Sequence, residues 1–89
     1  MMSNTEIAGI RRDLWLSQVE IGRIIGVAGS TVSRWERGVS RPTAYHEELL
    51  KRFKRANFLN PSAGAIAKDL IVTRGSVEAL WFLLNESYR

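Results

Sequence analysis

Two helices are expected in the middle of the chain, joined by a turn of only about three residues, and this short turn restricts the fold more than any other feature. The first, "SQVEIGRIIG", begins at Ser17 with Glu20 as its capping-box partner and ends at Gly26. The second, "VAGSTVSRWERG", ends at Gly38, where a left-handed residue is least costly. Because the turn is so short, the two helices must pack against each other. We therefore expect a compact helical pair over residues 17–38.

Further helices are expected on both sides of this pair. One covers residues 5–16 with Thr5 as its N-cap, and another covers residues 43–58 with Thr43 as its N-cap. After the break "NPSAG", the remaining residues form two short helices divided near 72–73. The chain is therefore predicted to be all-α, with five to six short helices. The positions expected to be buried are Ile7, Ile10, Leu14, Val19, Ile21, Ile24, Ile25, Leu49, Leu50, Phe53 and Ala56.

The length of 89 residues allows one small domain, and the 45% of hydrophobic residues supply one modest core. Residues 1–58 would form its main part, and residues 59–89 a C-terminal helical extension of the same compact domain. The absence of cysteine excludes disulfides and thiolate metal sites, so the fold depends on packing, alone or with a partner chain. The charged start and the lack of a long apolar run predict a soluble, cytoplasmic protein without a signal peptide or a membrane span.

The positive charge is concentrated in the middle of the sequence. The chain carries a net charge of +4, and residues 17–58 alone contain eight basic and four acidic side chains, so both flanking segments are neutral. This pattern has two explanations, a solvated surface or a centre that faces a polyanion. The run "KRFKR" at residues 51–55 likewise has two, a second phosphate contact or the solvated face of an amphipathic helix.

The stretch "STVSRWERG" places two kinds of side chain on two faces of one helix. At about 100° per residue, Val32 and Trp35 share one side, where the indole ring would anchor the helix to the core. Glu36 falls at the edge of that side, where a carboxylate needs a partner, and Arg11 is the candidate. The opposite face would offer only donors to a polar, anionic ligand, and it carries Ser30, Ser33, Arg34 and Arg37.

Two helices joined by a tight turn, with arginines exposed on the second, form a helix-turn-helix arrangement. Residues 17–42 resemble the helix-turn-helix of the phage Cro/repressor family, also called the XRE family. The resemblance covers residues 5–58 well and the later residues poorly. The matching positions are Ser17, Gln18, Gly22, Gly26, Val32, Trp35, Glu36, Arg37, Gly38 and Pro42.

This resemblance implies binding to double-stranded DNA. Arg34 would contact guanine O6 and N7 in the major groove, and Gln18 would bind a phosphate at a helix N-terminus. Arg11 and Glu36 would form the family's structural ion pair. The full set of implied DNA contacts is Gln18, Ser30, Thr31, Ser33, Arg34, Arg37 and Arg41.

Two positions depart from the pattern of the family. Ala28 stands where the recognition helix usually has a hydroxyl cap, and Gly29 has no side chain at a position that commonly touches a base. Fewer direct contacts imply modest specificity, or a larger share of specificity from DNA shape.

The C-terminal segment repeats part of this pattern, because residues 66–80 align in residue type with residues 21–35. Residues 63–81 are thus a candidate for a degenerate second helix-turn-helix, in which Thr73 would cap the second helix. However, Ile71 replaces the turn glycine, and the exposed face has no surplus of positive charge. A structural echo is favoured over a second DNA-binding motif.

The final helix carries more apolar side chains than one face of so small a domain can bury. It is either a lid over the core or an interface, and its aromatic residues favour an interface. A two-fold dimer would set two recognition helices about 34–36 Å apart on successive major grooves. The residues expected at this interface are Leu80, Trp81, Leu84 and Tyr88.

Catalysis and metal binding are not expected. His46 is the only histidine and is expected to be an ordinary surface residue, and no nucleophile has a base at hand. We expect no cofactor, metal or small-molecule ligand. The sequence predicts a repressor that binds a near-palindromic operator in double-stranded DNA as a homodimer, with the helix at residues 29–37 in the major groove. The alternative is a small protein-interaction module, an antitoxin or phage adaptor, that uses its aromatic C-terminal helix and keeps the helix-turn-helix as a scaffold.

Overall fold

The computed structural model describes residues 1–88, and within that range it consists of helices and connecting turns without a strand. The all-α prediction is therefore confirmed, with six helices in the described chain. They are α1 (Asn4–Asp13), α2 (Gln18–Ile25), α3 (Gly29–Glu36), α4 (Ala44–Leu59), α5 (Ala63–Thr73) and α6 (Ser76–Glu86). Across the described range, no helix is both long enough and apolar enough to cross a membrane.

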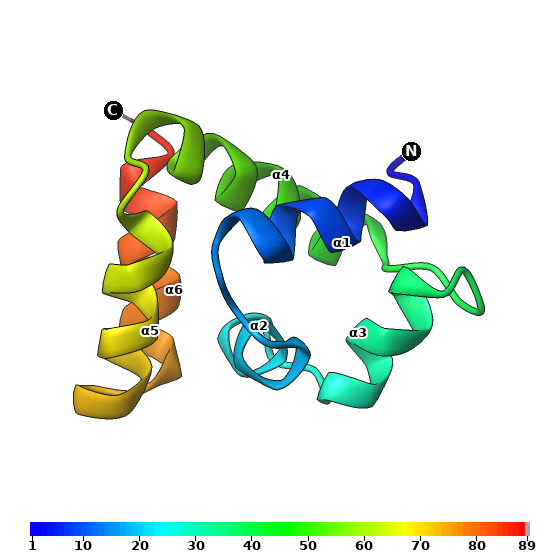
Figure 1. Ribbon diagram of the computed structural model, residues 1–89, viewed down its shortest axis with the longest axis horizontal. Coiled ribbons are helices and arrows are strands. Elements are labelled where there is room, and N and C mark those ends of the chain that lie inside the picture. The colour runs from blue at the N-terminus through cyan, green and yellow to red at the C-terminus, as the bar shows by residue number, and fades with distance from the viewer. Residues whose placement is uncertain (89) are drawn as a thin grey trace.

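The helices are arranged around one hydrophobic cluster. In Figure 1, α1 and α4 lie together along the top, α2 and α3 lie below them, and α5 and α6 form an upright pair at the left. Every helix contributes buried side chains to the cluster, including Ala63 and Ala67 from α5 and Leu83 from α6. Residues 59–88 therefore complete the same core that residues 1–58 begin.

Side chains and glycines at the helix ends explain most of the boundaries. The predicted capping box is present, since the Ser17 hydroxyl accepts from the Glu20 amide and the Glu20 carboxylate accepts from the Ser17 amide. Gly26 ends α2 in the left-handed conformation, with φ 85°, and Gly38 follows α3 with φ 74°. The predicted N-cap of α4, Thr43, accepts from the His46 amide. The three-residue turn between α2 and α3 is confirmed.

The predicted N-cap of α1 is wrong. Ser3, and not Thr5, caps this helix, because the Ser3 hydroxyl accepts a hydrogen bond of 3.1 Å from the Glu6 amide. Thr5 lies inside the first turn of the helix. Both residues are good capping residues, and starting two residues earlier adds the hydrogen bond from the Ile7 amide to the Ser3 carbonyl.

Two glycines allow close backbone approaches. A Cβ atom at Gly22 would lie 2.6 Å from the carbonyl oxygen of Val27, so a side chain there would force α2 away from the turn that follows it. A Cβ atom at Gly64 would lie 2.0 Å from the carbonyl oxygen of Leu14. The first confirms the small position predicted where the two helices meet. The second shows that α5 packs directly on the connection between α1 and α2.

Val19 is an exception to the predicted core, because 52% of its surface is exposed. Its side chain covers the start of α3, where a Cβ atom at Gly29 would come within 2.9 Å of the Val19 Cγ2. The other positions that the sequence predicts to be buried are buried. Gly29 is thus required by its contact with Val19.

The C-terminal pair of helices does not repeat the arrangement of α2 and α3. The helix α5 continues through Ile71 to Thr73, and the connection to α6 is only Arg74 and Gly75. Thr73 does not cap α6, because its hydroxyl donates to the Asp69 carbonyl within α5. The helices α5 and α6 pack along each other as a hairpin, whereas α2 and α3 cross at a steep angle (Figure 1).

Candidate nucleic-acid interface

The two faces of α3 differ in burial as the sequence predicts. Val32 and Trp35 are buried in the core, while Ser30, Arg34 and Arg37 are exposed. Thr31 and Ser33 are half-buried at the sides of the helix. The N-cap position of the helix is Ala28, which offers no side-chain cap, so the first amides of α3 remain available to an external acceptor.

His46 is not an ordinary surface residue. It is half-buried, and its ring centroid lies 5.5 Å from that of Trp35, so it packs against the anchor of α3. Its Nδ1 lies 3.1 Å from the Thr43 hydroxyl. The prediction failed because the cap at Thr43 turns the first residues of α4 toward the end of α3.

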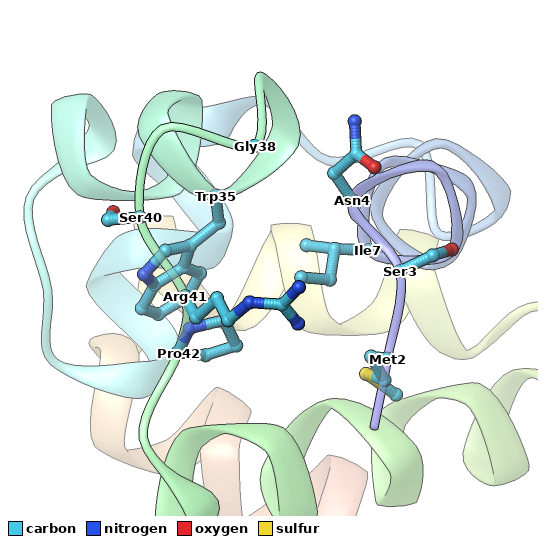
Figure 2. Close-up of a pocket in the computed structure, with 9 residues that line it drawn as sticks. All are labelled: Met2, Ser3, Asn4, Ile7, Trp35, Gly38, Ser40, Arg41 and Pro42. Carbon is cyan, nitrogen blue, oxygen red and sulfur yellow. The ribbon is translucent and has the colours of Figure 1, made fainter.

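The N-terminal residues pack behind α3. Figure 2 shows Met2, Ile7, Trp35 and Arg41 around a hollow of about 160 Å³. The Arg41 guanidinium lies across this hollow and contacts the Met1 Sδ. The structure therefore places Arg41 apart from the row of donors on α3, at the edge of the loop that follows it.

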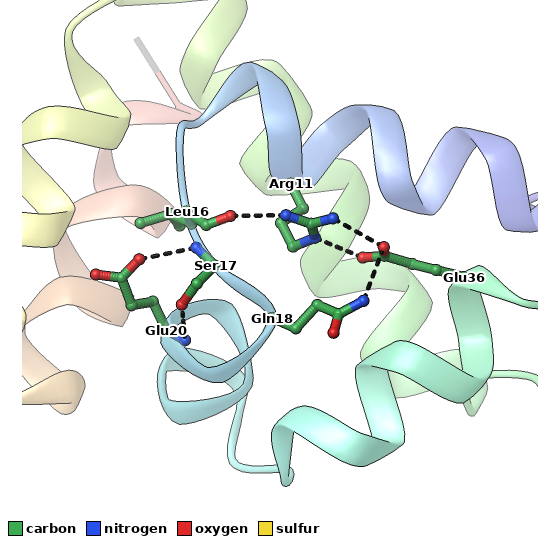
Figure 3. Close-up of polar contacts among 6 residues, drawn as sticks. All are labelled: Arg11, Leu16, Ser17, Gln18, Glu20 and Glu36. Atoms are coloured by element: carbon green, nitrogen blue, oxygen red, sulfur yellow. Dashed lines mark hydrogen bonds and ion pairs between the residues drawn. The ribbon is translucent and has the colours of Figure 1, made fainter.

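Arg11 and Glu36 form a bidentate ion pair between α1 and α3 (Figure 3). The Arg11 Nε donates to the Glu36 Oε2 at 2.6 Å, and the Arg11 Nη2 donates to the Glu36 Oε1 at 2.9 Å. The Arg11 Nη1 also donates to the Leu16 carbonyl at 3.0 Å. Both ends of the pair are largely shielded from solvent, so it fixes α3 against α1 in one orientation.

Gln18 joins this pair. Its Nε2 donates to the Glu36 Oε1 at 3.2 Å, which brings the N-terminus of α2 to the end of α3 (Figure 3). The backbone adds another link, since the Asn4 Nδ2 donates to the Glu36 carbonyl at 3.2 Å. Sequence reasoning missed both contacts, because neither residue has a charge that would signal a partner.

These contacts determine the ionisation of Glu36. Burial of its carboxyl raises the pKa, but hydrogen bonds from Arg11 and Gln18 and the charges of Arg11 and Arg12 outweigh burial. The pKa of Glu36 therefore lies below its usual value, and Glu36 is ionised at neutral pH. The hydrogen bond to Glu36 raises the pKa of Arg11 in turn. The backbone hydrogen bond from Ser17 lowers the pKa of Glu20.

The basic run at residues 51–55 is tied to partners inside the chain. Lys54 lies 3.5 Å from Glu6 of α1, and the Arg55 Nε donates to the Ser87 carbonyl at 2.8 Å. Lys51 and Arg52 pair with acids one turn earlier, at Glu47 and Glu48. This pattern favours the solvated face over the second phosphate contact. By contrast, none of the ion pairs within residues 1–88 involves Arg34 or Arg37.

The residues expected at a dimer interface divide into two groups. Leu80 and Leu84 are half-buried and pack against the core, as a lid would. Trp81 and Tyr88 are 58% and 73% exposed, as residues of a dimer interface are when the partner is absent. The Arg52 guanidinium lies 5.2 Å from the centre of the Tyr88 ring. In the part of the chain that the structure describes, no His, Cys, Asp and Glu side chains gather into a group that could hold a metal.

Comparison with known proteins finds a match in the helix-turn-helix region. Residues 7–45 match the family model described as "Helix-turn-helix", which extends here from α1 through α3 to the start of α4. No curated protein and no solved structure matches the chain. The matched range includes Gly22 at the α2–α3 crossing and both members of the Arg11–Glu36 pair. The match supports the resemblance of this region to helix-turn-helix proteins of the Cro/repressor or XRE type, a family of DNA-binding transcription regulators.

Proposed function

We propose that the protein is a repressor that binds a specific site in double-stranded DNA with α3 in the major groove. The observation that carries this proposal is the exposed face of α3, where Ser30, Arg34 and Arg37 offer only donors and hydroxyls. The two arginines have no intramolecular ion pair among the described residues, so their charges are available to an anionic partner. Occupying a promoter with such a domain would exclude other proteins from the same groove.

The individual contacts follow from position. Arg34, near the middle of the exposed face, would donate to guanine O6 and N7, a contact worth about 1–3 kcal/mol of discrimination. Thr31 and Ser33, at the sides of the helix, would reach neighbouring bases or phosphates. Gln18 at the start of α2 would share a phosphate with the helix N-terminus while holding Glu36. Arg37 and Arg41 would contact the backbone beyond the end of α3.

A dimer through α6 fits the spacing of successive major grooves. The helix α6 packs on α2, which packs on α3, so α2 separates the outer face of α6 from the recognition helix. With helix axes about 8–10 Å apart, two such stacks related by a two-fold axis contain five helix-to-helix steps and place the α3 helices at most about 50 Å apart. Because the axes are not collinear, about 34–36 Å is within reach. A near-palindromic operator would follow from this symmetry.

The test is a selection of bound duplexes from a random pool at physiological salt, with wild type, Arg34→Ala and Arg74→Ala. Arg74 is an exposed arginine at the end of α5 and serves as the matched control. We expect a two-fold-symmetric motif from wild type and Arg74→Ala, and its loss with Arg34→Ala. An unenriched wild-type pool would refute the proposal.

The exposed Trp81 and Tyr88 favour a second candidate, a module that binds another protein through α6. Sedimentation of wild type and Trp81→Ala separates the two candidates. A dimer that dissociates in the variant supports the homodimer. A wild-type monomer without DNA selectivity would support the protein-binding module.

A further inference from the structure

Trp15 adopts a backbone conformation that ordinarily belongs to glycine. Its φ is 59°, and it is the one residue other than glycine with positive φ in residues 1–88. The Trp15 amide donates to the Arg12 carbonyl at 2.9 Å and the Leu16 amide donates to the Arg11 carbonyl at 3.2 Å. These two bonds form the Schellman closure of α1, in which glycine is the usual left-handed residue. The closure itself therefore gives no reason for a tryptophan.

The side chain of Trp15 gives the monomer no packing in return. It is 82% exposed, so it adds little to the core while an apolar ring remains in water. A left-handed backbone and an exposed indole both disfavour tryptophan at this position. Because both the backbone conformation and the exposure of the ring are unfavourable in the isolated chain, we expect the Trp15 side chain to contact a binding partner.

The surroundings of Trp15 indicate an anionic partner. Trp15 lines a broad depression with Arg11, Arg12, Ser17, Glu20 and Lys68. Lys68 comes from α5, and its Nζ lies 3.7 Å from Glu20. Arg12 is exposed and takes part in none of the ion pairs among residues 1–88. Since Glu36 balances Arg11 and Glu20 balances Lys68, the exposed Arg12 leaves the depression with a net positive charge.

This depression is continuous with the surface around α3. Ser17, on its rim, is the N-cap of α2, and the next residue, Gln18, contacts Glu36 at the end of α3 (Figure 3). Arg11 belongs to both places, since it lines the depression and holds Glu36. A duplex that reached α3 and the start of α2 would continue along this rim.

We propose that Trp15, Arg12 and Lys68 bind the sugar-phosphate backbone that flanks the site contacted by α3. The indole ring packs on deoxyribose while Arg12 and Lys68 neutralise phosphates on either side of it. The C-terminal hairpin thereby enters the DNA interface through Lys68. This inference rests on the proposed function and extends its footprint beyond the major groove.

The test uses the selected site in two duplexes, one with long flanks and one trimmed to the motif. Binding is measured by fluorescence anisotropy at several salt concentrations for the wild type, Trp15→Gly, Trp15→Ala and the double variant Arg12→Gln/Lys68→Gln. The double variant should weaken binding to the long duplex by about fivefold per cation near 0.15 M salt and lower the salt slope by about 2. Trp15→Gly should also weaken it, although its thermal midpoint rises because glycine relieves the backbone. The trimmed duplex should bind all variants as it binds wild type.

Two matched controls isolate the surface. Phe58→Ala removes an aromatic ring that is also 82% exposed, and Lys54→Gln removes a lysine that is likewise paired with one glutamate, at 3.5 Å. Neither residue lines the depression, so both controls should bind the long duplex as wild type does.

The outcomes separate this inference from the proposed function. Equal affinities and salt slopes for all Trp15, Arg12 and Lys68 variants, with loss of binding in Arg34→Ala, would overturn the inference and leave the function in place. A wild type without duplex selectivity would overturn both. If Trp15→Ala weakened self-association in sedimentation and left DNA binding unchanged, the depression would be a protein contact, which also overturns the inference.

Discussion

The two helical pairs α2–α3 and α5–α6 have related sequence patterns but different geometries. In the first, Gly26 ends the helix with φ 85°, and the chain crosses into α3 after three residues. In the second, Ile71 occupies the aligned position, remains helical, and the chain turns only at Gly75. A β-branched residue strongly resists the left-handed conformation, so the helix continues to the next available glycine. The position of one glycine thus determines whether such a pair crosses or folds back.

The exposed faces of the two pairs differ as well. The outer face of α3 presents hydroxyls and guanidiniums, whereas the outer face of α6 presents Val77 and Trp81. The first suits a hydrated polyanion and the second suits an apolar surface. Two helical pairs with a similar pattern of buried residues can therefore present exposed faces suited to different partners.

The largest test of this comparison replaces one tryptophan from each pair. Trp35→Ala should destabilise the protein by about 3–5 kcal/mol, because it removes a buried anchor and leaves a cavity. Trp81→Ala should change the free energy of unfolding of the monomer by about 0.5 kcal/mol or less, because its ring is mostly exposed. Urea denaturation at a concentration below self-association checks both. Similar losses would show that the two pairs are equally integrated into the core.

The next test concerns the shielded ion pair that fixes α3 of the first helical pair to α1. Glu36→Gln should cost about 3 kcal/mol at pH 7, since it leaves the shielded Arg11 without its counter-charge. The depressed pKa of Glu36 stabilises the wild type fully above the ordinary glutamate pKa of about 4.3, and this stability is lost as pH falls through the folded pKa. The gap between wild type and variant should therefore shrink in acid. A gap independent of pH in a denaturation series would contradict this account.

The two turn glycines offer a smaller and more direct comparison. Gly75 has φ 106° and ψ 166°, a region almost closed to other residues, so Gly75→Ala should cost about 1–3 kcal/mol. Gly26 has φ 85° and ψ 29°, which other residues tolerate better, so Gly26→Ala should cost about 1 kcal/mol. An added Cβ meets nothing within 4 Å at either position, and backbone strain is thus the sole difference. Thermal unfolding should rank the variants in this order, and the reverse order would refute the explanation.

The smallest effect concerns the missing cap of α3. Ala28→Ser should stabilise the protein by about 0.5–1 kcal/mol, because the hydroxyl can accept from an amide in the first turn. The control is Ala65→Ser, at an exposed position within α5, which should lower the stability by about 0.3 kcal/mol. Calorimetry of both variants would show whether the free amides of α3 are a weakness of the fold.

Local signals in the sequence predicted much of the fold. The Ser17 box, Gly26 and the Val32–Trp35 face depend on residues close together in the chain, and they are present in the structure. The pairing of Arg11 with Glu36 was found from a charge at the edge of a buried face, together with a family resemblance. The roles of Arg34 and the other expected DNA contacts remain predictions.

Features that depend on contacts between distant segments were missed. The sequence did not show that Val19 stays exposed and packs on the start of α3 at Gly29, or that Gly64 packs on the Leu14 backbone. The partners of Lys54 and Arg55 lie in α1 and after α6, so the run itself could not show that its charges are engaged. The left-handed Trp15 had no signal either, since glycine is the residue that marks such a position.

The three links to Glu36 have a mechanical consequence. Arg11 and Gln18 hold its side chain, and Asn4 holds its carbonyl, so the last turn of α3 is gripped from α1 and α2 at once. A helix held in this way cannot rotate about its long axis, so each outward side chain keeps a fixed orientation toward the edge of a base pair. New preferences for DNA sequence can then arise by exchanging single outward side chains, because the orientation of the remaining ones does not change.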